Sequence, residues 1–206
     1  MLISQLTVGL LGTNSYLVRD REAKQAVLID PGAESARLLA ELGQDRLMMI
    51  LLTHAHFDHI LAADDVRKKT GAPLFVHTDD AELLGDGEKN GSMSVLCRDL
   101  TVSPADRLLK SGEEIPFGNS AFRVLHTPGH TRGSVCYLFG NTLFTGDTLF
   151  AGAAGRTDLY GGSGEMLLRS LKKLRDLPGD FDVLPGHGEA TSLGEERRLN
   201  EYLNLF

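Results

Sequence analysis

Three histidines and one aspartate stand within the seven residues 53–59. They directly follow the apolar run at residues 47–52, which is typical of a buried strand. Imidazole and carboxylate groups hold zinc in proteins, and they also suit iron and manganese. This much histidine at the end of a strand predicts a metal site, and we expect it to hold two ions.

Further candidate ligands occur downstream. His130, Asp147 and His187 each follow a short apolar, strand-like segment and a Gly or Pro-Gly turn. Such positions lie on loops at strand ends, where functional side chains collect on a rigid scaffold. The candidate metal ligands are therefore His54, His56, Asp58, His59, His130, Asp147 and His187.

Two other histidines, His77 and His126, have no ligand-like pattern around them. We interpret both as structural residues, either at the surface or hydrogen-bonded in the core. For His126 a role in orienting a ligand imidazole is the alternative.

Composition favours a soluble globular enzyme. The 206 residues are 42% hydrophobic and carry a net charge of -7, with no Lys/Arg run of the kind that phosphate binding needs. Cys97 and Cys136 form no CxxC motif, which suits a reducing cytoplasm. No signal peptide and no membrane-spanning run is evident. We expect a cytoplasmic protein without a nucleic-acid or membrane partner, as a monomer or small homo-oligomer.

The apolar pattern predicts strands and helices in alternating groups. Strand-like segments occupy residues 2–8, 15–19, 26–30, 122–127, 134–139 and 142–145, the last two joined by a Gly140-Asn141 hairpin turn. Helical segments occupy residues 33–42, 58–69, 166–174 and 195–203, and the leucines of the third are interpreted as core packing. Residues 85–106 look irregular. This order favours a sandwich over a doubly wound parallel sheet.

The His-x-His-x-Asp-His core at residues 54–59, followed in order by a His, an Asp and a His, resembles the metallo-β-lactamase superfamily over nearly the whole chain. The resemblance implies an α/β (α+β) fold, a four-layer αββα sandwich, in a single domain over residues 1–206. It also implies two ions. The first would bind His54, His56 and His130, the second would bind Asp58, His59 and His187, and Asp147 would bridge both.

These ligands predict a reaction. Two ions that share a carboxylate can hold a hydroxide between them, because metal binding lowers the pKa of water towards ~7. The hydroxide can attack a carbonyl carbon, with Asp58 as the catalytic residue that accepts its hydrogen bond. We find no evident general acid for a leaving amine, whereas a thiolate leaves readily because the pKa of a thiol is only about 8.5. The ligands therefore favour thioester hydrolysis, because its leaving group needs no general acid from the site.

A Gly-rich loop follows Asp147. Within it, Arg156 could clamp a substrate carboxylate and Tyr160 could hydrogen-bond or stack, although an internal salt bridge to Asp158 accounts for Arg156 equally well. Gly-Arg-Thr-Asp at residues 155–158 is similar to the glyoxalase II (hydroxyacylglutathione hydrolase) and persulfide dioxygenase branch. The chain ends nineteen residues after His187, so it resembles short glyoxalase II-like proteins without the glutathione-binding helical C-terminal region.

Three functions stay open. The first is a hydrolase of small thioesters of the S-lactoylglutathione type with two divalent ions, zinc first and iron or manganese as alternatives. The second is a mononuclear iron persulfide dioxygenase that would use His56, His130 and Asp147. The third is a catalytically silent metal-binding module. We do not expect β-lactamase activity, because those enzymes lack a bridging Asp at the position of Asp147.

Overall fold

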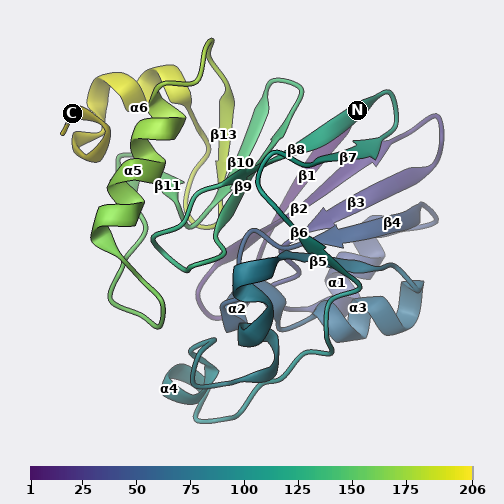
Figure 1. Ribbon diagram of the computed structural model, residues 1–206. Coiled ribbons are helices and arrows are strands. Elements are labelled where there is room, and N and C mark those ends of the chain that lie inside the picture. Colours follow the sequence, from purple (N-terminus) through teal and green to yellow (C-terminus); the bar gives the residue numbers. More distant parts are fainter. Residues whose placement is uncertain (206) are drawn as a thin grey trace. The chain divides into compact units, whose positions relative to one another are not determined.

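The computed structural model describes residues 1–205. The chain divides into two compact units, Met1–Leu109 and Lys110–Phe206, called here the N-terminal and C-terminal units. Each unit contains one six-stranded mixed sheet together with helices (Figure 1). The single domain expected over residues 1–206 stays a prediction.

The sheet of the N-terminal unit keeps its strands in chain order. They are β1 (Leu2–Val8), β2 (Thr13–Asp20), β3 (Gln25–Ile29), β4 (Arg46–Leu51), β5 (Leu74–His77) and β6 (Arg107–Leu109). The first three pair antiparallel, and β3 to β6 pair parallel. The carboxyl ends of β3, β4 and β5 therefore share one edge with the start of β2. Segments that are far apart in the sequence therefore meet at that edge.

The helices of this unit correct two expectations. They are α1 (Ser35–Leu42), α2 (Phe57–Ile60), α3 (Ala63–Thr70), the 3-10 helix η1 (Thr78–Gly85) and α4 (Ser92–Leu96). The single helix predicted at residues 58–69 is wrong: it is interrupted before α3, where the backbone N–H of Ala62 donates to the carbonyl of Pro31. The helix predicted from residue 33 begins at Ser35, because Glu34 is left-handed (φ 52°). Helices α1 and α3 lie side by side (Figure 1).

The sheet of the C-terminal unit has the order β14-β13-β10-β9-β8-β7. Its strands are β7 (Glu114–Phe117), β8 (Ser120–His126), β9 (Val135–Phe139), β10 (Thr142–Gly146), β13 (Asp182–Pro185) and β14 (Thr191–Ser192), with β11 (Leu149–Phe150) and β12 (Ala153–Ala154) in a separate ribbon. The predicted β9–β10 hairpin is present. Because β13 runs parallel to β10, and β8 runs in the same direction, all three strands end at one edge. The segments that follow them carry the downstream candidate ligands.

Three helices complete the C-terminal unit: α5 (Gly164–Arg175), α6 (Leu193–Leu199) and the 3-10 helix η2 (Glu201–Asn204). The leucine stripe of α5 packs in the core with Leu143 and Val183, as predicted. One helix at residues 195–203 is wrong. Asn200 interrupts it, since its amide group bonds the carbonyls of Phe150 and Ala153 while its oxygen accepts from Tyr202 N. Within residues 1–205, no helix has the length and apolar character needed to cross a bilayer.

Candidate metal centre

Four predicted ligands lie together in the N-terminal unit, just after β4. The rings of His54 and His56 meet edge-on with centroids 4.9 Å apart, and the ring of His59 is 4.1 Å from that of His54. Asp58 Oδ2 lies 3.5 Å from His59 Nε2. All three histidines are buried. We call these four residues the N-terminal ligand set.

A buried carboxylate that the sequence analysis missed orients this set. Asp30, at the end of β3, is 1% exposed. It accepts hydrogen bonds from the backbone N–H and the hydroxyl of Thr53 at 2.7 and 2.6 Å. Its Oδ2 also lies 3.0 Å from Nδ1 of His59. A proton on Nδ1 that bonds Asp30 leaves Nε2 of His59 available for a metal ion.

Two more side chains hold the same loop. Asp80, fully buried, accepts from the backbone N–H of Ala55 at 3.0 Å. The Thr13 hydroxyl donates to Asp58 Oδ2 at 2.8 Å. Gly32 is required beside them, because a Cβ there would lie 2.2 Å from the carbonyl oxygen of Asp58. Of these residues only Asp30 had a sequence signal, since it directly follows an apolar strand, although it precedes its Pro-Gly pair whereas His130 and His187 follow theirs.

The C-terminal unit brings its three predicted ligands together around one carboxylate. Oδ2 of Asp147 lies 3.5 Å from Nε2 of His130 and 3.5 Å from Nε2 of His187. The three residues come from the segments after β8, β10 and β13, which end at one edge of the sheet. We call them the C-terminal ligand set. A carboxylate between two imidazoles has the arrangement that a shared ligand needs.

Backbone groups of the following loop hold the C-terminal set. Nδ1 of His130 lies 2.8 Å from the carbonyl oxygen of Arg156, so a proton on Nδ1 directs Nε2 towards Asp147. Gly155 packs directly on the set. A Cβ at this position would lie 1.8 Å from the carbonyl oxygen of Asp147 and 3.4 Å from Cβ of His130. No residue with a side chain fits there without moving Asp147.

The two predicted substrate residues lie on the same loop. Arg156 makes two hydrogen bonds of 2.6 Å to the carboxylate of Asp158, and both side chains are largely exposed. This pairing raises the pKa of Arg156 and lowers the pKa of Asp158 to about 2. Tyr160 is 38% exposed, and the guanidinium of Arg132 lies 5.3 Å from its ring centroid. Arg132 carried no sequence signal that pointed to a role here.

The remaining two histidines have structural contacts. His77 Nδ1 accepts from the backbone N–H of Asp79 at 3.3 Å and so caps η1. His126 Nε2 lies 2.8 Å from the carbonyl oxygen of Arg132. These contacts engage one ring nitrogen of each residue, and the structural interpretation of His77 and His126 stays a prediction.

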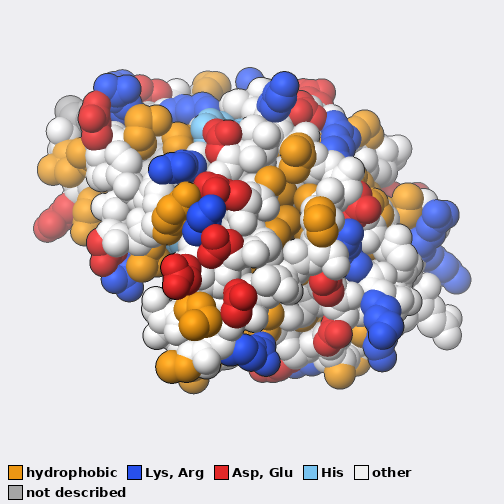
Figure 2. Space-filling model, turned by 60° about the horizontal axis from the view of Figure 1, so that its bottom comes forward, with side chains coloured by type: hydrophobic (Ala, Val, Ile, Leu, Met, Phe, Trp, Pro, Cys, Tyr) orange, Lys and Arg blue, Asp and Glu red, His pale blue; other side chains and the backbone are white. Residues whose placement is uncertain are grey.

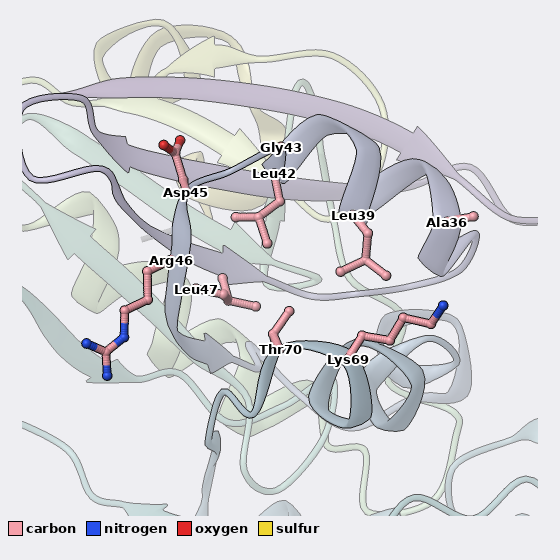
Figure 3. A pocket seen from close by; sticks show the side chains of 9 residues that line it. All are labelled: Ala36, Leu39, Leu42, Gly43, Asp45, Arg46, Leu47, Lys69 and Thr70. Atoms are coloured by element: carbon pink, nitrogen blue, oxygen red, sulfur yellow. The ribbon is translucent and has the colours of Figure 1, made fainter.

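A cavity of about 550 Å³ in the N-terminal unit is lined by residues of α1, the start of β4 and the end of α3 (Figure 3). Leu39, Leu42 and Leu47 line it, with Arg46 and Lys69 among the polar residues. It opens at the beginning of β4, whereas the ligand set follows the end of that strand. With no ligand in its lining, this cavity is not a candidate for the reaction site.

The donor chemistry of both ligand sets fits divalent metal ions. Each set combines imidazole nitrogens with one carboxylate, the donors that zinc, iron and manganese accept. Thiolates do not contribute: Cys136 is buried in β9, where burial raises the pKa of its thiol to about 11. The His/Asp cluster is therefore suited to bind metal.

A family model described as the metallo-beta-lactamase superfamily matches residues 8–187. The chain belongs to this superfamily. The matched range contains all seven predicted ligands, and the resemblance drawn from the sequence is confirmed. Two curated relatives match nearly the full length. The probable metallo-hydrolase YqgX of Bacillus subtilis is 39% identical over 98% of this chain and 97% of its own. The hydroxyacylglutathione hydrolase GloC of Haemophilus influenzae is 33% identical over 99% of both chains.

Solved structures show the same fold. The chain is similar to BLEG-1, a B3 metallo-beta-lactamase, with 40% identity and a TM-score of 0.93 over 98% of this chain and 99% of that one. A di-iron-bound form of TTHA1623 matches with 39% identity and a TM-score of 0.86 over 97% and 100%. ETHE1 from Myxococcus xanthus matches with 33% identity and a TM-score of 0.82 over 98% and 88%. The predicted mixed α/β fold class is confirmed, and the family supports a metal-dependent hydrolase.

Proposed function

We propose that this protein is a dinuclear metal-dependent thioester hydrolase. One ion would bind His54, His56 and His130, and the other would bind Asp58, His59 and His187. Asp147 would serve both ions. The observation that carries the proposal is the position of Asp147 Oδ2, 3.5 Å from an imidazole assigned to each ion. Full-length similarity to the hydroxyacylglutathione hydrolase GloC supports the thioester class.

The residues divide the chemistry between them. When bound, the two ions would supply a water of lowered pKa and a positive charge that polarises the substrate carbonyl. Asp58 would accept a hydrogen bond from the attacking oxygen and so orient it towards the carbonyl carbon. The leaving group needs no protein acid, because a thiolate is stable near neutral pH.

We propose Arg156 and Tyr160 as substrate contacts of limited strength. The charge of Arg156 is already balanced by Asp158, so a substrate carboxylate has to compete with that carboxylate. Tyr160 keeps an exposed ring, and Arg132 beside it adds a second cation. This favours small acyl thioesters and a high KM for glutathione thioesters.

We also propose a class of substrate, a compartment and an oligomeric state for this protein. Lys/Arg and Asp/Glu side chains are interspersed on the face shown in Figure 2, which supports a small-molecule substrate over a nucleic acid. The free state of Cys97 and Cys136 supports a reducing compartment such as the cytoplasm. We keep a monomer or small homo-oligomer as a proposal.

The test is metal content per chain together with S-lactoylglutathione hydrolysis by the purified full-length protein. We expect two zinc, iron or manganese ions and turnover of the thioester. Nitrocefin tests the similarity to BLEG-1 in parallel. If the protein holds two ions and hydrolyses nitrocefin but not the thioester, the proposed thioester hydrolysis is wrong and the protein is a β-lactam hydrolase.

The second candidate is a mononuclear iron persulfide dioxygenase, favoured by the resemblance of Gly-Arg-Thr-Asp at residues 155–158 to that branch of the superfamily. It would use His56, His130 and Asp147 around a single iron. Oxygen uptake with glutathione persulfide, at one iron per chain, would support it against the hydrolase. A silent metal-binding module would show metal but neither activity.

A further inference from the structure

Thr13 makes a direct contact with one of the proposed ligands. It is the first residue of β2 and is 1% exposed. Its hydroxyl donates a hydrogen bond of 2.8 Å to Oδ2 of Asp58, 45 residues further along the chain. A carboxylate can only accept here, so the Thr13 proton has a defined position between the two oxygens.

The backbone around Thr13 keeps the contact in place. Thr13 pairs with Val8 across the β1–β2 hairpin. Its Cβ and Cγ2 lie 3.2 Å from where a Cβ of Gly32 would be, and the carbonyl oxygen of Asp58 is also within 2.2 Å of that point. Thr13, Gly32 and Asp58 are thus packed against one another. Because a β-branched side chain has few χ1 options, the hydroxyl is held facing the carboxylate.

We propose that Thr13 is a positioning residue for Asp58, which rests on the proposed role of Asp58 as a ligand of the second ion. The hydrogen bond restricts rotation of the carboxylate and presents it to the ion in one orientation. Both candidate ligands of the second ion in the N-terminal unit would then be oriented by a side chain from outside the motif: His59 by Asp30, directly after β3, and Asp58 by Thr13 in β2.

Losing a partner of a metal ligand typically weakens metal affinity or activity 10- to 100-fold. The variant Thr13→Val removes the hydroxyl and keeps the branched shape, whereas Thr13→Ser keeps the hydroxyl. Thr7→Val is a matched control. The Thr7 hydroxyl donates to Asn14 in the same hairpin at 2.9 Å, so the control loses one hydrogen bond of the hairpin and no contact to a ligand.

The experiment is chelator competition with the zinc-loaded, full-length protein, in which a zinc-responsive dye follows release of each ion. In Thr13→Val we expect one of the two ions to leave at about 10- to 100-fold lower chelator concentration. The other ion should be retained as in the wild type. Thr13→Ser and Thr7→Val should release both ions as the wild type does. Unchanged release from Thr13→Val, or equal weakening in Thr7→Val or Thr13→Ser, would overturn the role of Thr13.

This readout separates the two proposals. If Thr13→Val loses the second ion while the wild type fails to hydrolyse thioesters, the positioning role stands and the proposed function is wrong. If the wild type hydrolyses thioesters with two ions and Thr13→Val holds both normally, the function stands and the positioning role is wrong.

Discussion

The two ligand sets are built in opposite ways. The N-terminal set takes all its candidate ligands from residues 54–59, and side chains from other parts of the N-terminal unit orient it: Thr13 in β2, Asp30 directly after β3 and Asp80 in η1. The C-terminal set takes its ligands from three strand ends, and backbone groups of one loop hold it, through the carbonyl of Arg156 and the close packing of Gly155. In the contiguous motif, polar partners from other elements add to the local contact between Thr53 and His54. Ligands from strands that end at one edge are placed by the sheet itself.

The largest effect should come from Asp147→Ala, which removes the centre of the C-terminal set. The variant loses the one ligand assigned to both ions, and with it several kcal/mol of transition-state stabilisation by the metal ions. We therefore expect kcat/KM to fall on the order of 10³-fold. Metal analysis should show fewer than two ions per chain. Full metal content in this variant would contradict the dinuclear assignment.

Asp58→Asn tests the carboxylate of the N-terminal set. Size is kept while charge is removed, so kcat should fall by ~100-fold or more if Asp58 both accepts the hydrogen bond and binds metal. The measurement is kcat alongside metal content. An unchanged rate at normal metal content would leave Asp58 with a structural role only.

Asp30→Asn sharpens the comparison, because it changes a hydrogen-bond partner of the N-terminal set and leaves every candidate ligand in place. In an amide only the oxygen can accept hydrogen bonds, because the NH2 group donates. The amide therefore cannot replace both carboxylate oxygens that face Thr53 and His59, and we expect metal affinity to fall by about 10- to 100-fold. Asp80→Asn is the companion variant, since Asp80 bonds a backbone N–H of the loop. A larger loss in Asp80→Asn than in Asp30→Asn would show that holding the loop matters more than orienting His59.

Gly155→Ala tests the packing of the C-terminal set. Its Cβ would overlap the carbonyl oxygen of Asp147, and we expect a destabilisation of about 1–3 kcal/mol with weaker metal binding. Gly152→Ala is the control. Gly152 has a positive φ of 68° and open space around it, so its cost should be limited to backbone strain of roughly 1–2 kcal/mol without loss of metal. Thermal unfolding and metal content distinguish the two variants. Equal metal loss in both would remove the special role of Gly155.

The smallest effect is expected for Arg156→Ala. Asp158 already binds the guanidinium, so Arg156 should contribute little free energy to substrate binding. A dedicated charged contact would contribute roughly 1.5–3 kcal/mol, and the rise in KM for S-lactoylglutathione should be much smaller than the loss of such a contact would cause. The pKa of Asp158 is lowered in the folded protein. The pairing is therefore present above the ordinary aspartate pKa and is lost only as pH falls through about 2, so KM should show no Arg156-dependent change between pH 6 and 8. A tenfold rise in KM would show that Arg156 binds substrate strongly despite its pairing with Asp158.

Much of the fold was predictable because its signals are local. Strand β4 was evident from a continuous apolar run, the β9–β10 hairpin from Gly140-Asn141, and the core face of α5 from the spacing of its leucines. Two of the failures occurred where a distant group competes for the backbone. Pro31 takes the N–H of Ala62 and ends the helix predicted at residues 58–69. Asn200 divides the last helix because its side chain bonds residues about fifty positions away.

In the site, too, local features could be predicted from the sequence and long-range contacts could not. The sequence alone determined the candidate ligands and their places after strands, since a His-x-His-x-Asp-His motif and Gly-His or Gly-Asp turns consist of adjacent residues. Only the tertiary structure decided what orients them. Asp30 meets Thr53 across 23 positions and Thr13 meets Asp58 across 45. It also decided that Arg156 pairs with Asp158. Such pairings depend on which strands share an edge and where a long side chain finds its partner, and neither is encoded in local periodicity.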